Sequence, residues 1–143
     1  MKIQTVATTV SAPHDEVFRF LASVENLPRW APEFCQRVER RHGRWIAHTA
    51  QGELRFAIAA DVHTGVIDLY AGATPETMAF FPLRVMPLPE GTTAITFTFF
   101  QPPGMPDEVY DRQHESLVGE MRGLAARFGG GETHASPGVC AAA

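Results

Sequence analysis

Cysteines and long hydrophobic runs are both scarce in this chain. Its two cysteines, Cys35 and Cys140, do not have the spacing of a metal site or of a disulfide framework. No hydrophobic run approaches the ~18 residues that a membrane-spanning helix requires, and residues 1–10 lack the apolar segment of a signal peptide. We therefore expect a cytoplasmic protein without a membrane span.

An excess of basic residues is also missing. The formal net charge is −4, whereas binding to nucleic-acid phosphates normally requires a basic surface. The arginines within residues 37–44 are mixed with Glu39 and have no interleaved aromatic residues, so we interpret them as a solvated hairpin tip. His48 and His63 have no carboxylate or cysteine at ligand spacing. We expect no nucleic-acid partner, no metal and no cofactor.

Hydrophobic periodicity divides the rest of the chain into helices and strands. Residues 2–10 alternate as a strand, residues 11–24 have helical spacing, and residues 26–32 form a second short helical turn that ends at Pro32. Between Phe34 and Gln101, alternating apolar runs are separated by turns that contain glycine or proline. This pattern predicts about six further strands, paired antiparallel.

Residues 105–128 have the pattern of one long helix. Its apolar stripe repeats at intervals of three and four residues, so the stripe occupies one face; it consists of Tyr110, His114, Leu117, Met121, Leu124 and Phe128. We expect this face to lie across the sheet, with a cavity between helix and sheet. Residues 1–128 are predicted to form a single domain, and residues 129–143, which are small and polar, a flexible C-terminal tail.

Four short motifs carry a resemblance to a known superfamily. Ala12-Pro13 precedes the first helical pattern, and the loop after that helix ends in Pro28-Arg29-Trp30. Residues 64–68 read TGVID, residues 82–85 read PLRV, and residues 103–105 read PGM just before the last helix. With these motifs and this order of elements, residues 1–128 resemble the START/Bet v 1-like (SRPBCC) superfamily, and within it the bacterial polyketide cyclase/dehydrase-like subgroup.

The resemblance implies an α+β helix-grip fold. In that fold, a curved antiparallel sheet of about seven strands surrounds a long C-terminal helix, and two short helices follow the first strand. The subgroup often carries His-Trp after the aspartate of its TGV motif, whereas this chain has Leu69-Tyr70. No role of that histidine is therefore carried over.

We predict that the cavity binds a small hydrophobic or aromatic molecule, which the resemblance makes polyketide- or lipid-like. Such a ligand requires a cavity of roughly 300 Å³ or more. Neither the sequence nor the resemblance identifies the molecule. The predicted ligand-binding residues are Trp45, Phe56, Tyr70, Phe80, Arg84, Phe97, Phe99, Tyr110, His114 and Leu117.

Two alternatives from other functional classes stay open. One is a cyclase- or dehydratase-type enzyme with His114 as acid or base and Tyr70, Tyr110 or Arg84 stabilising negative charge on oxygen. A structural histidine at the edge of the packing stripe, satisfied by solvent or a backbone carbonyl, is the favoured alternative for His114. The other alternative is a protein-interaction module with a large exposed apolar patch. Whether Asp68 pairs with Arg84, and whether the chain forms a homodimer, is also open.

Overall fold

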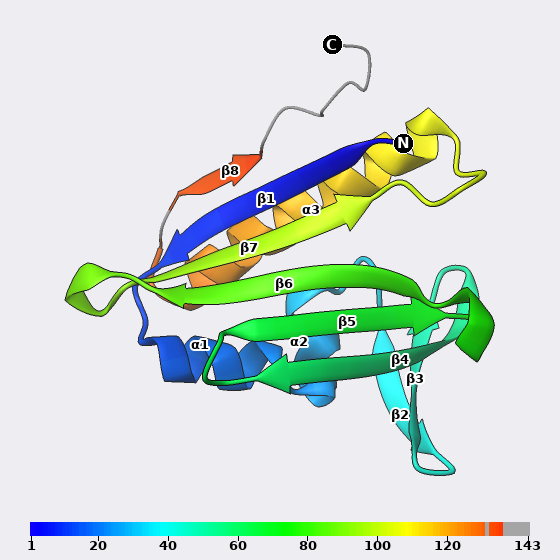
Figure 1. Cartoon of the computed structure of the whole chain (residues 1–143), viewed down its shortest axis with the longest axis horizontal. Helices are drawn as coiled ribbons and strands as arrows, with labels where there is room; N and C mark the ends of the chain where they lie inside the picture. Colours follow the sequence, from blue (N-terminus) through cyan, green and yellow to red (C-terminus); the bar gives the residue numbers. More distant parts are fainter. Residues whose placement is uncertain (131, 136–143) are drawn as a thin grey trace.

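The computed structural model describes residues 1–130 and 132–135, which form one antiparallel sheet and the helices that pack on it (Figure 1). The strands are β1 (Ile3–Val10), β2 (Arg37–Arg41), β3 (Arg44–Thr49), β4 (Gly52–Asp61), β5 (Val66–Gly72), β6 (Ala79–Pro87), β7 (Thr93–Phe100) and β8 (Thr133–Ala135). The helices are α1 (His14–Leu21), η1 (Val24–Asn26), α2 (Leu27–Trp30), η2 (Pro75–Thr77), η3 (Pro89–Gly91) and α3 (Asp107–Arg127).

The sheet has the strand order β2-β3-β4-β5-β6-β7-β1-β8. Strands β2 to β7 follow one another as a meander, and β7 then pairs with β1 in the register Val6↔Phe97. The sheet is curved and does not close, because β2 and β8 both remain edges. The predicted α+β helix-grip architecture is confirmed, with one strand more than expected.

Local sequence explains where the helices begin and end. Pro106 is the N-cap of α3, and Asp107 and Glu108 place negative charge in its first turn. Gly129 and Gly130, both with positive φ, follow the helix. Figure 1 shows α3 running alongside β1 and β7, while α1 and α2 lie at the other half of the sheet. None of the helices in the described ranges has the length and hydrophobicity needed to cross a membrane.

The TGV motif performs a structural task. Gly65 has φ +73°, and a Cβ at this position would lie only 2.0 Å from the Val85 carbonyl oxygen. The backbone N–H of Val85 donates a hydrogen bond to the Gly65 carbonyl, and the imidazole of His14 lies 3.1 Å from the Val85 carbonyl oxygen. Glycine is therefore required where α1, the β4–β5 loop and β6 meet.

One segment differs from the expected tail. Residues 133–135 form β8, which pairs with the edge of β1 in the register Ala7↔His134. The side chain of Thr8 is buried and donates a hydrogen bond to the Glu132 carbonyl, and its hydroxyl lies 3.0 Å from that of Thr133. These polar contacts attach the segment to the sheet although its composition is tail-like. The rest of the predicted tail, at residue 131 and residues 136–143, lies outside the described residues.

Candidate functional site

A cavity of about 180 Å³ lies between the inner face of the sheet, α2 and the middle of α3. The side of the sheet that faces α3 is called the inner face. Strand alternation places every second residue of β4 to β7 on this face, so large side chains from several strands meet there. The cavity is lined by six aromatic side chains, which are Trp30, Phe34, Phe56, Phe81, Phe97 and Phe99, together with Leu27, Ala31, Leu69 and Leu117.

The aromatic walls pack against one another. Trp30 meets Phe97 edge-on at 6.3 Å between ring centroids, and Phe81 stacks on Phe99 at 6.3 Å. Trp30, from α2, is a buried member of the core, and Phe34 follows in the loop that leads to β2. The short α2 segment therefore provides the wall opposite the sheet.

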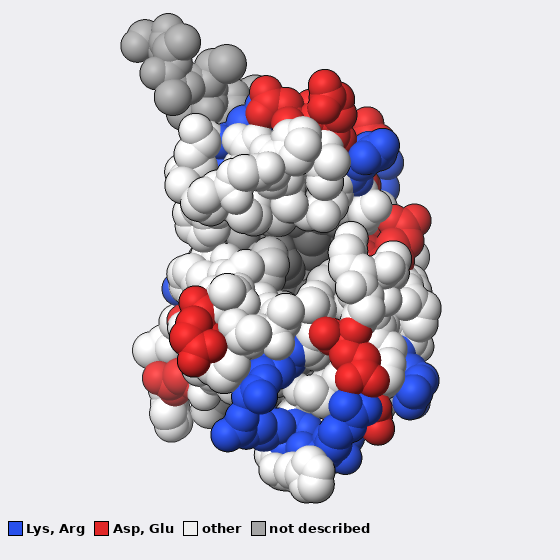
Figure 2. Space-filling model, turned by 90° about the vertical axis from the view of Figure 1, so that its right-hand side faces the viewer, with Lys and Arg blue, Asp and Glu red and all other residues white. Residues whose placement is uncertain are grey.

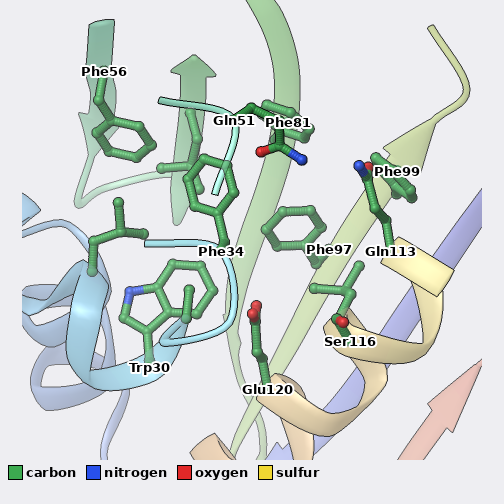
Figure 3. Close-up of a pocket in the computed structure, with 14 residues that line it drawn as sticks. Trp30, Phe34, Gln51, Phe56, Phe81, Phe97, Phe99, Gln113, Ser116 and Glu120 are labelled. Carbon is green, nitrogen blue, oxygen red and sulfur yellow. The ribbon is translucent and has the colours of Figure 1, made fainter. Parts of the chain in front are cut away.

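Four polar residues complete the lining. Gln51 comes from the β3–β4 turn, and Gln113, Ser116 and Glu120 come from α3, where spacings of three and four residues place them on one face. Figure 3 shows the Glu120 carboxyl group pointing from α3 into the space between Trp30 and Phe97. Figure 2 shows the molecule hollowed at the centre of one face, with mainly uncharged residues around the hollow and charged side chains further out.

Glu120 has the most strongly perturbed carboxyl group near the cavity. Burial raises the pKa of Glu120 to about 8, and the nearby negative charge of Glu33 adds to the rise. A hydrogen bond from the Phe34 backbone opposes both effects without cancelling them. Glu120 therefore exchanges its proton near neutral pH, where it can donate or accept a hydrogen bond.

Four of the ten residues predicted to bind ligand line the cavity; they are Phe56, Phe97, Phe99 and Leu117. Trp45 pairs directly with Phe56 in the sheet but does not line the cavity. The guanidinium carbon of Arg40 lies 5.6 Å from the centroid of the Trp45 ring. Whether the four lining residues contact a ligand stays a prediction.

Tyr110 and His114 lie on the α3 face that packs against the sheet, outside the cavity lining. Tyr110 is fully buried, stacks on Phe99 at 4.6 Å and donates a hydrogen bond to the Phe99 carbonyl at 2.8 Å. Nε2 of His114 is buried without a hydrogen-bond partner in the described part of the chain. Burial lowers the pKa of His114, so the imidazole favours its neutral form.

Tyr70, Phe80 and Arg84 alternate with the inner-face residues and lie on the outer face of the sheet. Tyr70 packs on Phe80 at 5.4 Å between ring centroids, and Phe80 stacks on Phe100 at 6.3 Å. Arg84 forms an ion pair with Asp68, with 2.8 Å between Nη1 and Oδ1. This placement gives no support to the predicted contact of these three residues with a ligand in the cavity, and it shows the Asp68–Arg84 pair that the sequence left open.

Glu39, His48 and Glu53 bring three metal-capable atoms within 4.8 Å of one another on the outer strands. Arg41 already forms ion pairs with both carboxylates, and Nε2 of His48 lies 2.7 Å from Glu39 Oε1. The arginine supplies the positive charge that a cation would bring, so this cluster is satisfied as an ion-pair network.

None of the residues predicted to bind ligand belongs to the wall formed by α2, and none of the four polar lining residues was predicted either. Glu120 lies three residues after Leu117, beside the apolar stripe and not on it. The signal that was present is the spacing of Gln113, Ser116 and Glu120, a polar row that flanks the stripe at intervals of three and four. A solvent-exposed helix face has the same polar pattern. Only the position of α2 shows that this row borders a cavity instead of solvent.

No protein-family model matches the sequence, and no curated protein matches it either. Solved structures do match. A START superfamily protein from Mycobacterium smegmatis is 14% identical over 89% of this chain and 99% of that chain, with a TM-score of 0.62. The di-domain ARO/CYC BexL from the BE-7585A biosynthetic pathway is 21% identical to this chain, with a TM-score of 0.66. The match covers 88% of this chain and 46% of that chain.

A third match is Ara h 8.0201, of the Bet v 1 family. It is 17% identical over 88% of this chain and 97% of that chain, with a TM-score of 0.58. At these identities the likeness concerns the fold. The predicted resemblance is confirmed at that level: the chain has the helix-grip fold of the START/Bet v 1-like (SRPBCC) superfamily.

Proposed function

We propose that the protein binds a compact hydrophobic or aromatic molecule, about the size of a single ring, in the cavity between the sheet and α3. The observation that carries the proposal is the cavity of about 180 Å³ with six aromatic side chains in its walls. Apolar cavities with a few polar groups are the usual form of small-molecule sites. The fold shared with a START superfamily protein and an ARO/CYC protein agrees with this class of function.

The size of the cavity favours a small ligand over a large one. An apolar cavity of about 150 Å³ holds a benzene molecule, whereas sites for larger molecules have volumes of about 300 Å³ upward. At about 180 Å³ the cavity is smaller than the roughly 300 Å³ expected from the sequence for the bound hydrophobic molecule. We therefore favour a single-ring molecule over a multi-ring polyketide or a long-chain lipid.

A size series tests this proposal. We expect p-cresol to bind at least tenfold more tightly than 2-hydroxyanthracene, because both carry one hydroxyl group and only the smaller ring system matches about 180 Å³. Calorimetric titration of both compounds measures the difference. Tighter binding of the three-ring compound, or binding of neither, would contradict the proposal.

The enzyme alternative has one observation in its favour. An acid with a pKa near the working pH is suited to proton transfer, and within the cavity that group is Glu120 and not His114. A cyclase- or dehydratase-type activity would therefore use Glu120 as its acid or base. Turnover of a carbonyl-bearing substrate that survives Glu120→Gln would remove this alternative.

A further inference from the structure

The described wall of the cavity carries one acidic group and no basic one. Among the described residues that line it, Glu120 is the only ionisable one, and the other polar side-chain groups are the amides of Gln51 and Gln113, the hydroxyl of Ser116 and the indole N–H of Trp30. In the part of the chain that the structure describes, no lysine, arginine or histidine belongs to the lining. A carboxylate at this position would therefore have no cationic partner in the cavity wall.

The surroundings of Glu120 add to this imbalance. Trp30 and Glu120 also line a second hollow, together with Glu33, Arg29 and Arg127. The negative charge of Glu33 raises the pKa of Glu120 and so disfavours its carboxylate form further. Within the described residues, a hydrogen bond from the Phe34 backbone favours the charged form.

Aromatic rings surround the same carboxyl group. Trp30, Phe34 and Phe97 lie around the end of the Glu120 side chain (Figure 3). The faces of aromatic rings attract cations, and aromatic cages with an acidic residue suit quaternary ammonium groups. The amide and hydroxyl oxygens of Gln51, Gln113 and Ser116 can also accept hydrogen bonds or face a positive charge.

We propose that the cavity binds a small organic cation, with an ammonium group of about trimethylammonium size set between the aromatic rings and the Glu120 carboxylate. This inference rests on the proposed function, to which it adds the charge of the ligand. The bound cation supplies the positive charge that the cavity wall lacks. The carboxylate form of Glu120 is the form that attracts the cation. At a pH below the pKa of Glu120, binding of the cation therefore releases the carboxyl proton to solvent.

A pair of probes of equal shape tests the inference. Choline and 3,3-dimethylbutan-1-ol differ in one atom, a positively charged nitrogen in place of a neutral carbon, and the charge of choline does not change with pH. Dissociation constants for both are measured by NMR titration at pH 6, 7, 8 and 9. The proteins are wild type, Glu120→Gln and the control Glu115→Gln, which alters an exposed glutamate of α3 outside the lining.

We expect choline to bind wild type and Glu115→Gln at least tenfold more tightly at pH 8 than at pH 6, because deprotonation of Glu120 is linked to binding. Glu120→Gln should bind choline about tenfold more weakly at pH 8 and without pH dependence. The neutral alcohol should bind wild type and Glu120→Gln alike at pH 6.

Equal or tighter binding of the alcohol to wild type at pH 8 and 9 would overturn the cation inference and leave the proposed function standing. Choline affinity that is the same at every pH, or unchanged in Glu120→Gln, would also overturn it. If neither probe binds, the cation inference is contradicted, and if p-cresol also fails to bind, so is the proposed function.

Discussion

Replacing Glu120 with glutamine is expected to stabilise the protein at pH 8 by on the order of 3 kcal/mol and to leave its stability at pH 4.5 nearly unchanged. The folded state raises the pKa of Glu120 from 4.5 to about 8, mainly through burial. Between these values the folded protein keeps a proton that the unfolded chain loses. Each pH unit in this range therefore lowers the free energy of unfolding by at most about 1.4 kcal/mol.

The sign of the effect is specific to a raised acid pKa. The stability that Glu120 contributes is fully present below the unfolded value of 4.5 and is lost as the pH rises toward about 8. Glutamine keeps the shape and carries no titratable proton, so the difference between wild type and variant isolates this one group. Urea unfolding at pH 4.5, 6 and 8 measures that difference. A difference that does not change with pH would contradict the account of Glu120, and Glu115→Gln is the matched control.

Filling the cavity from α3 should abolish ligand binding. Ser116 lines the cavity, and a ring the size of benzene needs about 150 Å³, so Ser116→Phe would occupy most of the available volume. We expect the affinity for p-cresol to fall at least tenfold. Because the new ring enters existing space, the cost in stability should stay within the roughly 1–3 kcal/mol typical of overpacking.

The neighbouring residue provides the control for this variant. Glu115 is exposed on the same helix and is not part of the cavity lining, so Glu115→Phe introduces the same side chain outside the site. Calorimetric titration of both variants with p-cresol, with thermal unfolding alongside, separates loss of volume from loss of fold. Full retention of p-cresol binding in Ser116→Phe would place the ligand elsewhere.

The fold was predictable because each of its parts has a local signal. Alternation identified the strands, the three-and-four spacing identified α3, and the turn at His42-Gly43 has the two positive φ values that a tight hairpin needs. Strand β8 was missed because residues 133–135 are held by contacts with Thr8, far away in the sequence.

The site was predictable only in part, because alternation does not say which face of a strand turns inward. Phe80 and Phe81 are adjacent aromatics, as are Phe99 and Phe100, so β6 and β7 each carry an aromatic residue on both faces. The structure places Phe81 and Phe99 in the cavity, whereas Phe80 and Phe100 stack on the outer face.

The choice of His114 over Glu120 has a similar physical reason. Leu117 belongs both to the stripe that packs on the sheet and to the cavity lining. On either side of Leu117, one face of α3 turns to the sheet and another turns to the cavity. His114 lies toward the sheet, and Glu120 lies toward Trp30. Which side of the helix borders the cavity depends on where α2 rests, a long-range contact that helix periodicity does not contain.

The two tryptophans provide the most direct test of the central claim that the cavity binds a small ring. Trp30 lines the cavity and Trp45 does not, so their indole N–H signals in an NMR titration with p-cresol report on the site and on the rest of the sheet. The account predicts a saturable shift of the Trp30 signal and little change at Trp45. An unchanged Trp30 signal at saturating p-cresol, or equal shifts at both tryptophans, would contradict it.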